Sequence, residues 1–236
     1  MKTRPAHRLR PTTIEPFVTA APGSVVITQG HTRVLCTASV DETPKWLMPK
    51  PGSDPSVRPK GWVTAEYSML PGSTSQRKRR GVDSRGTEIQ RLIGRALRAS
   101  VDLEKMPGVA IACDCDVLQA DGGTRTASIT GAFVALAQCI AHCRQSGIIQ
   151  DDPIIGPVAA VSVGIIDDIA RLDLDYELDV RAQVDMNVAM NHRGQFVEVQ
   201  GTAEGAAFSR AQLDRLLTLA AGGIRELMKV QRRALA

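Results

Sequence analysis

Hydrophobic residues follow two different periods along this chain, and each period predicts a different kind of element. In the first half, small and apolar residues alternate with Asp114 and Asp116 over residues 111–118, a period of two that is typical of strands. Residues 24–27, 32–40 and 62–67 are also predicted to be strands. Gly30 separates the first two of these segments, which are therefore expected to form a hairpin. The first half is thus rich in predicted strands.

Three other segments place apolar residues at helical spacing. The first predicted helix covers residues 88–103, with Arg85 in a small polar turn just before it. A second helix is expected to carry its apolar residues from Ile129 onward on one face. The last helix opens at Ser209, and Gln212 three residues later completes the pattern of a capping box.

The second half repeats this order of strands followed by a helix. Its strands are predicted at residues 158–166, 170–178, 185–190 and 195–200. The recurrence predicts an α+β fold of two similar halves that pack as one unit, with residues 10–141 and 157–224 as the halves.

The first candidate for function is the turn at residues 121–125, Asp-Gly-Gly-Thr-Arg. Its two glycines allow a tight turn and leave room above the backbone. The free N–H groups of the following helix would point into that room, beside the Arg125 guanidinium and the hydroxyls of Thr124 and Thr126. This arrangement predicts an anion site. An ordinary strand-to-helix turn remains the alternative, because short glycine motifs often match by chance.

The second candidate is the acidic segment at residues 172–179, together with Asp185. Its alternation predicts a strand that carries four carboxylates on one face, those of Asp173, Asp175, Glu177 and Asp179. Their mutual repulsion would be relieved by water, by basic side chains or by a hard cation such as Mg²⁺ or Mn²⁺. A solvated strand face and a metal site are both open interpretations. Neutralising Asp173 alone is expected to have a mild effect.

Composition limits the classes of protein to which the chain can belong. A hydrophobic share of 43% is normal for a globular chain and argues against disorder of the whole. Aromatic residues make up only 3%, so stacking platforms for single-stranded nucleic acid would be few. The net charge of +4 is a mild excess, so clusters of arginine matter more than the sum.

The five cysteines and the absence of long apolar runs predict the compartment. No cysteine pair has the usual C-x2-C spacing, so small buried thiols in a reducing compartment are favoured over a zinc site. There is no apolar run of about 18 residues that would predict a membrane span. The basic first ten residues have no apolar core that would predict a secretory signal. We therefore expect a cytoplasmic protein without a membrane partner.

Several stretches together resemble the ribonuclease PH family of phosphorolytic exoribonucleases. They occur in the family's order and cover nearly the whole chain, so the set is far more specific than any one of them. The matching stretches are LRP (9–11), GHTRVLCTASV (30–40), GWVTAEYSMLP (61–71), EIQRLIGRALR (88–98), DCDVLQADGGTRT (114–126), LDLDYELD (172–179), DMN (185–187) and FVEVQGT (196–202).

The resemblance implies two similar βαβ-type halves of the ribonuclease PH fold and a ring-shaped homohexamer, a trimer of dimers. It implies that inorganic phosphate cleaves the 3′-terminal phosphodiester of tRNA precursors and other RNA, releasing nucleoside diphosphates, and that the reverse reaction adds nucleotides. The family's phosphate site falls on Arg85, Gly123, Thr124 and Arg125. Its acidic catalytic pair falls on Asp179 and Asp185, for which Mg²⁺ or Mn²⁺ is the expected cofactor.

Four further arginines are candidate RNA contacts, namely Arg77, Arg79, Arg80 and Arg91. A solvated loop or a subunit interface is an equally open role for these side chains. The chain departs from the family in its first residues, in a longer segment before Gly61 and in Gly72, where the family has an arginine. The competing hypothesis is a non-catalytic ring subunit that only binds RNA, as in exosome cores, but such subunits lose the acidic pair or the phosphate arginines.

Overall fold

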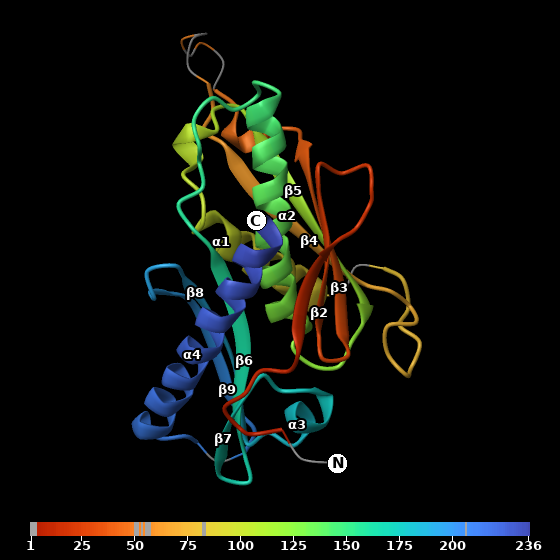
Figure 1. Cartoon of the computed structure of the whole chain (residues 1–236), viewed down its shortest axis with the longest axis vertical. Helices are drawn as coiled ribbons and strands as arrows, with labels where there is room; N and C mark the ends of the chain where they lie inside the picture. The colour runs from red at the N-terminus through yellow and green to blue at the C-terminus, as the bar shows by residue number, and fades with distance from the viewer. Residues whose placement is uncertain (1–3, 50–51, 53, 55–57, 82–83, 206) are drawn as a thin grey trace.

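The computed structural model describes residues 4–49, 52, 54, 58–81, 84–205 and 207–236. The first half forms a five-stranded sheet in the order β1-β2-β3-β5-β4 (Figure 1). Its strands are β1 (Thr12–Pro16), β2 (Gly23–Gln29), β3 (Thr32–Asp41), β4 (Trp62–Met69) and β5 (Ala110–Gln119). Strands β4 and β5 pair in parallel, and helix α1 (Ser84–Arg98) makes the crossover between them. The short 3₁₀ turns η1 (Lys45–Leu47) and η2 (Leu103–Lys105) lie in the connections.

The second half forms a four-stranded antiparallel sheet in the order β7-β6-β8-β9. Its strands are β6 (Val158–Ile166), β7 (Ile169–Leu172), β8 (Val184–Asn191) and β9 (Phe196–Ala203). A short helix, α3 (Tyr176–Val180), lies between β7 and β8, and the long helix α4 (Arg210–Leu235) packs along the sheet. The predicted capping box at the start of α4 is confirmed, because Ser209 and Gln212 bond each other's backbone N–H groups.

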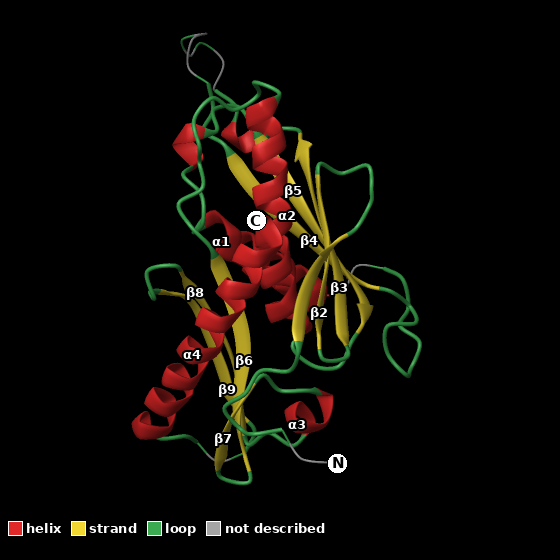
Figure 2. Cartoon of the chain, in the orientation of Figure 1, coloured by secondary structure: helices red, strands yellow, loops and turns green. Residues whose placement is uncertain are grey.

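Helix α2 (Thr124–Gln145) belongs to the first half, and Figure 2 shows it between α1 and the strands of the first sheet, with the end of α4 beside it. It packs against β2 and β3 of the first sheet and against β6 and α4 of the second half. The prediction that its apolar residues lie on one face is therefore wrong. Every residue from Thr126 to Leu136 is buried, so this part of the helix is buried on all sides. By length and composition α2 could cross a membrane, but 78% of its most apolar window is buried inside the protein, as in the core helix of a folded domain.

Two large hydrophobic clusters lie one under each sheet, and a small third cluster joins Ile166, Leu174 and Ala182. The larger cluster joins the first sheet to α1 and α2 and extends to Val158, Ala160 and Ala189 of the second sheet. The smaller of the two large clusters joins the second sheet to α4. Because the larger one crosses from one half to the other, the halves pack as one unit, and the predicted α+β fold of two similar halves is confirmed.

Helix α1 is shifted along the chain relative to its prediction. It begins at Ser84, so Arg85 lies in the first helical turn and not in a polar turn before it. It ends at Arg98, because the Ser100 hydroxyl donates to the carbonyl of Leu97 at 2.6 Å and so satisfies one of the last free carbonyls.

The predicted acidic strand is wrong in its second part. The strand β7 ends at Leu172, and Asp173 adopts a left-handed conformation with φ of 59°. The Asp175 carboxylate then accepts a hydrogen bond from Leu178 N at 3.0 Å and caps α3. Alternation misled the prediction because Asp173 is a buried ion-pair partner and Asp175 is a helix cap, so the four carboxylates do not share one face. The burial of Asp173 beside Arg10 also revises the mild effect that was expected from neutralising it.

The cysteine prediction agrees with the structure. All five thiols, Cys36, Cys113, Cys115, Cys139 and Cys143, are free and buried. Burial raises the pKa of the Cys113 and Cys139 thiols, which keeps them protonated and unreactive. They fill the core as small apolar side chains.

Candidate active site

The glycine turn packs directly against the segment that leads into α3. Gly122 and Gly123 both have left-handed backbones, with φ of 70° and 66°. A Cβ added to Gly122 would lie 2.5 Å from the carbonyl oxygen of Leu174, so a side chain would push the two segments apart. Glycine here therefore serves a close approach as well as a turn, and it brings the start of α2 next to α3.

Three elements hold the side chains at the start of α2. The hydroxyls of Thr124 and Tyr67 of β4 are 2.8 Å apart, within hydrogen-bond distance. The Arg125 guanidinium donates to the Gln200 side chain of β9 at 2.8 Å, and Gln200 in turn donates to Glu88 of α1 at 2.7 Å. Arg125 is thus oriented by a chain of side chains from β9 and α1.

The two predicted phosphate arginines converge on one place from different helices. Arg85 comes from the first turn of α1, and Arg125 from that of α2. Burial raises the pKa of Tyr67, whereas its hydrogen bond with Thr124 and the charges of Arg85 and Arg125 act in the opposite direction. Because both guanidinium groups act on the same phenol, the structure brings together all the predicted phosphate-binding side chains.

The two predicted catalytic aspartates also meet at this place. Asp179 lies on α3, and Asp185 lies near the start of β8. Although Asp179 has an accessible surface, the surrounding protein removes enough water to raise the pKa of its carboxyl, and the Asp185 carboxylate raises this pKa further. The guanidinium groups of Arg125 and Arg85 oppose these effects. The two arginines and the two aspartates therefore lie near one another in the fold.

A groove of about 450 Å³ runs from this site along β4. Two of the four predicted RNA-binding arginines, Arg79 and Arg80, line it together with Arg85. Asp116 also lines the groove, and burial raises the pKa of its carboxyl, with a smaller contribution from Asp114. The groove thus extends from Arg85 along β4, with Arg79 and Arg80 among its lining residues.

The structure places Arg91 away from this groove, and Arg77 does not line it. Arg91 lies in a smaller groove of about 300 Å³ with Trp62, Arg95 and Arg98. The Arg98 guanidinium lies 4.4 Å over the Trp62 ring and donates to the carbonyl of Val63. Arg95 pairs with Glu198 of β9 at 2.7 Å. Arg95 and Arg98 therefore bond other elements of the fold.

Sequence reasoning missed three residues of the site. Tyr67 ends the buried face of β4, Gln200 lies in the middle of β9, and Asp116 lies on the partly exposed side of β5. The local patterns of Gln200 and Asp116 do not separate them from ordinary strand residues. Tyr67 carries one signal, because its polar hydroxyl follows Val63 and Ala65 on the buried face of β4.

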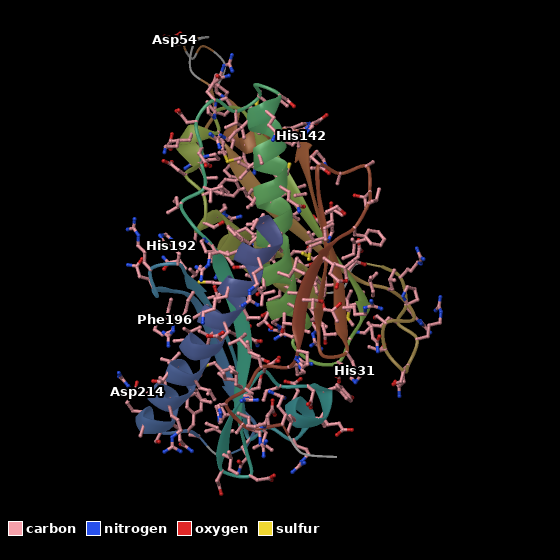
Figure 3. All side chains as sticks on the ribbon, in the orientation of Figure 1. His31, Asp54, His142, His192, Phe196 and Asp214 are labelled. Carbon is pink, nitrogen blue, oxygen red and sulfur yellow. The ribbon has the colours of Figure 1, made fainter. Side chains whose placement is uncertain are left out.

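A larger cavity lies elsewhere and has different chemistry. Its volume is about 990 Å³, and it runs between residues 7–9, β7 and α4, on which Asp214 is labelled in Figure 3. Its floor is largely apolar, with Leu9, Ala170, Leu172 and Leu219 among the lining residues. Arg8 and Arg215 line it together with the acidic Asp214 and Glu226, and none of the predicted site residues is among its lining residues.

The two carboxylates suit a divalent cation. Mg²⁺ commonly binds through one or two protein carboxylates and keeps several waters, so a larger ligand cluster is unnecessary. The raised pKa of Asp179 shows that Asp185 adds negative charge at the same place, which a cation would relieve. In the part of the chain that the structure describes, no group of three or more His, Cys, Asp or Glu side chains could hold a metal. Asp179 and Asp185 offer two carboxylates, the smaller kind of ligand set that Mg²⁺ can use.

This fold and site define a class of protein in which two packed α/β halves place two arginines at helix entrances beside paired carboxylates. The model of the 3′ exoribonuclease family, domain 1, matches residues 8–140, and that of domain 2 matches residues 156–223. The chain belongs to this family.

Relatives in bacteria narrow the comparison to ribonuclease PH. The ribonuclease PH of Corynebacterium efficiens is 54% identical over 224 residues, covering 93% of this chain and 89% of the relative. That of a Synechococcus species is 50% identical over 239 residues, covering 98% and 95%. That of Rhodopirellula baltica is 51% identical over 242 residues, covering 97% and 94%.

Solved structures share the fold at much lower identity. An Archaeoglobus fulgidus exosome with RNA bound to its active site matches with a TM-score of 0.80 and 20% identity, over 96% of this chain and 90% of that one. An archaeal exosome core matches with a TM-score of 0.77 and 20% identity, over 97% and 89%. This likeness concerns the arrangement of the backbone.

Proposed function

We propose that Arg85 and Arg125 bind inorganic phosphate and that Asp179 and Asp185 act on the leaving oxygen of the RNA 3′ end. The activity of the chain is that of a phosphorolytic 3′-to-5′ exoribonuclease, as its ribonuclease PH relatives at about 50% identity support. The observation that carries the proposed roles is the convergence of Asp185, Arg85 and Arg125 on Asp179. The Asp185 carboxylate raises the pKa of Asp179, and the two guanidinium groups lower it.

The first task of this site is to bring two anions together. The nucleophile is a phosphate dianion, and the phosphodiester that it attacks is also negative. Two guanidinium groups and the N–H groups at the start of α2 would hold the dianion and offset that repulsion. Arg125, fixed by Gln200, would present its remaining donors in one orientation, and positioning supplies much of the catalysis in phosphoryl transfer.

The reaction then exchanges one bond to phosphorus for another. A phosphate oxygen forms a bond to the phosphorus of the 3′-terminal linkage, and the bond from that phosphorus to the 3′ oxygen of the preceding ribose breaks. The products are a nucleoside diphosphate and an RNA shortened by one nucleotide. In reverse, a nucleoside diphosphate extends the RNA and releases phosphate.

The leaving ribose oxygen needs its developing charge stabilised. Asp179 and Asp185 would hold Mg²⁺ or Mn²⁺, and such a cation, when bound, stabilises that oxygen. The raised pKa of Asp179 also favours a second role, in which its protonated carboxyl donates the proton directly. The two roles predict opposite dependences on pH, so they can be separated.

The substrates and the assembly extend the same proposal. Arg79 and Arg80 would contact the RNA backbone along the groove that leads to Arg85. The expected substrates are tRNA precursors and other RNA 3′ ends, and the expected assembly is a ring-shaped homohexamer. Light scattering tests the assembly, because a fully active monomer would contradict the ring.

Dependence on phosphate is the test of the activity. The purified chain is incubated with a tRNA that carries extra 3′ nucleotides, with and without inorganic phosphate. We expect nucleoside diphosphates only when phosphate is supplied. Equal trimming without phosphate, with release of monophosphates, would identify a hydrolase. Tight RNA binding without either product would instead support the competing hypothesis of a non-catalytic ring subunit.

A further inference from the structure

A buried ion pair joins the glycine turn at the start of α2 to the segment that leads into α3. The Arg10 guanidinium binds the Asp173 carboxylate at 2.6 Å, and the Arg10 backbone N–H donates to the other oxygen of that carboxylate at 2.7 Å. The exposed fractions of the two residues are 6% and 1%. Such a pair, bonded twice and removed from water, fixes its geometry closely.

The same guanidinium also holds the glycine turn. It donates to the backbone carbonyl of Asp121 and, at 3.5 Å, to that of Gly122. These are the residues that immediately precede Gly123 and the start of α2. Arg10 therefore touches the phosphate-binding turn and Asp173 at once.

Asp173 in turn anchors the segment that carries Asp179. Its backbone N–H donates to the carbonyl of Ser162 in β6 at 2.6 Å, and the next N–H, that of Leu174, donates to the Ser162 hydroxyl at 2.9 Å. The segment then meets the turn again, because Tyr176 N donates to the Asp121 carboxylate at 3.3 Å. The turn and the start of α3 are thus tied together through Arg10, Asp173 and Asp121.

Stability alone gives a weak reason for this arrangement. Removing two charges from water offsets much of their attraction, so buried ion pairs are often no more stabilising than apolar residues of similar size. What an ion pair adds is a fixed geometry between the groups that it joins. Here those groups belong to the first half and to the second half.

We propose that Arg10 and Asp173 are positioning residues that hold the phosphate-binding turn and the Asp179 segment in register across the two halves. This inference rests on the proposed function of Arg125 and Asp179. A displacement of about 1 Å between reacting groups can cost on the order of 10²-fold in rate, so loss of the pair should reach the chemistry although neither residue contacts the substrate.

The test compares Asp173→Asn and Arg10→Lys in steady-state trimming of tRNA at several phosphate concentrations, well below each variant's melting temperature. Lysine keeps the positive charge for Asp173, but a single ammonium group cannot also reproduce the planar contacts to two carbonyls. We expect both variants to raise the KM for phosphate about tenfold and to lower kcat about tenfold or more. Arg10→Lys should lose less thermal stability than Asp173→Asn.

Gln231→Leu is the matched control for stability. Gln231 is buried in α4 and donates to the carbonyls of Thr130 and Val158 at 2.9 and 2.8 Å, far along the chain from the glycine turn. Its loss should lower the melting temperature while leaving both kinetic constants at their wild-type values. Arg10→Lys and Asp173→Asn with constants as normal as those of Gln231→Leu would overturn the proposal and leave the pair a structural feature.

Two further measurements keep the outcome decisive. Should Asp173→Asn fail to fold, the double variant Arg10→Gln with Asp173→Asn removes both charges, and wild-type constants in it would also overturn the proposal. The wild-type enzyme is assayed in parallel with and without phosphate. Trimming by the wild type without phosphate contradicts the proposed function itself, whereas normal variants of a phosphate-dependent enzyme contradict only the positioning role.

Discussion

The two parts of the site are built in different ways. The arginine part lies in the first turns of two helices, and the longer of these, α2 with 22 residues, is packed between strands of both sheets. In the acidic part, Asp179 lies on a helix of five residues, held by a cap at Asp175 and by the buried ion pair at Asp173, while Asp185 lies on β8. The first part takes its geometry from regular structure, whereas the second takes it from a few individual side chains.

This difference assigns different consequences to mutation. Side chains that hold phosphate act on the affinity for one substrate. Carboxylates that act on the leaving oxygen work mainly in the transition state, so their loss should lower turnover without a matching loss of binding. Kinetics that separate KM for phosphate from kcat therefore test whether the two parts have separate roles.

The largest effect is expected from Asp185→Asn. The substitution keeps the size of the side chain but removes the charge that a cation or a proton transfer would use. We expect kcat to fall by about 10²–10³-fold, with little change in the affinities for phosphate and RNA. Single-turnover trimming at saturating phosphate and several Mg²⁺ concentrations measures this fall.

A matched acid in the same half serves as the control. Asp167 forms an exposed ion pair with Arg181 at 2.6 Å, and Asp167→Asn should leave turnover unchanged, since exposed pairs contribute little. Near-normal turnover of Asp185→Asn would mean that the acidic part is not catalytic. Asp179→Asn should behave like Asp185→Asn, and the double variant should be little worse than either if both act on one cation.

The second largest effect is expected from Arg125→Ala and Arg85→Ala. Each removes a charge-assisted contact of about 1.5–3 kcal/mol, so each should raise the phosphate concentration for half-maximal rate roughly ten- to hundredfold. Arg95→Ala is the matched control on α1, since Arg95 pairs with Glu198 instead of entering the site. A fall in kcat with an unchanged KM for phosphate would contradict the division between the two parts.

The same contrast explains how far the sequence could predict this site. The glycine turn and the α2 entrance were predictable because two adjacent glycines and a following apolar period report the local backbone directly. The acidic segment was not, because LDLDYELD alternates like a strand, while burial of Asp173 by Arg10 depends on a residue 163 positions away. The family resemblance still placed Asp179 and Asp185 at positions that the structure brings together.

Tyr67 and Gln200 show a second reason why the sequence could not predict the whole site. Each lies in a strand whose pattern was predicted, yet each bonds a side chain from a different element. Only the packing of β4 and β9 against the start of α2 brings these partners together. Contacts of this kind carry no signal in the spacing of a single sequence.

The third prediction concerns the pH dependence of activity. If ionised Asp179 holds a cation, activity should fall on the acid side as pH drops through its raised pKa, at a higher pH than an ordinary aspartate would set. If protonated Asp179 is the acid, activity should fall instead as pH rises through that value. We expect the first profile, measured as kcat between pH 4 and 9 (roughly the range around these groups).

The pH dependence of stability gives an independent check on the direction in which the pKa of Asp179 is shifted. A carboxyl whose folded pKa is raised contributes stability that is complete below its unfolded pKa and is lost as pH rises through the folded pKa. Ionised Asp179 therefore disfavours folding at neutral pH, and Asp179→Asn should unfold at the same or a higher temperature there. Asp116→Asn, which removes another carboxyl with a raised pKa, should leave the acid limb of the activity profile in place.

The smallest effect is expected along the groove that leads to the site. Arg79 and Arg80 line that groove with Arg85, whereas Arg91 lies in a separate groove beside Trp62. A lysine or arginine that neutralises one RNA phosphate contributes about −0.7 to the slope of log affinity against log salt on a single strand. Arg79→Ala and Arg80→Ala should each reduce the slope by about that amount and weaken RNA binding only a few-fold in moderate salt, with an unchanged KM for phosphate.

Arg91→Ala is the matched control, because Arg91 lies in the neighbouring groove that shares Glu66 and Gln90 with the first. This variant should leave the slope unchanged. A reduced slope for Arg91→Ala, with normal slopes for the other two, would place the RNA along the Trp62 groove instead.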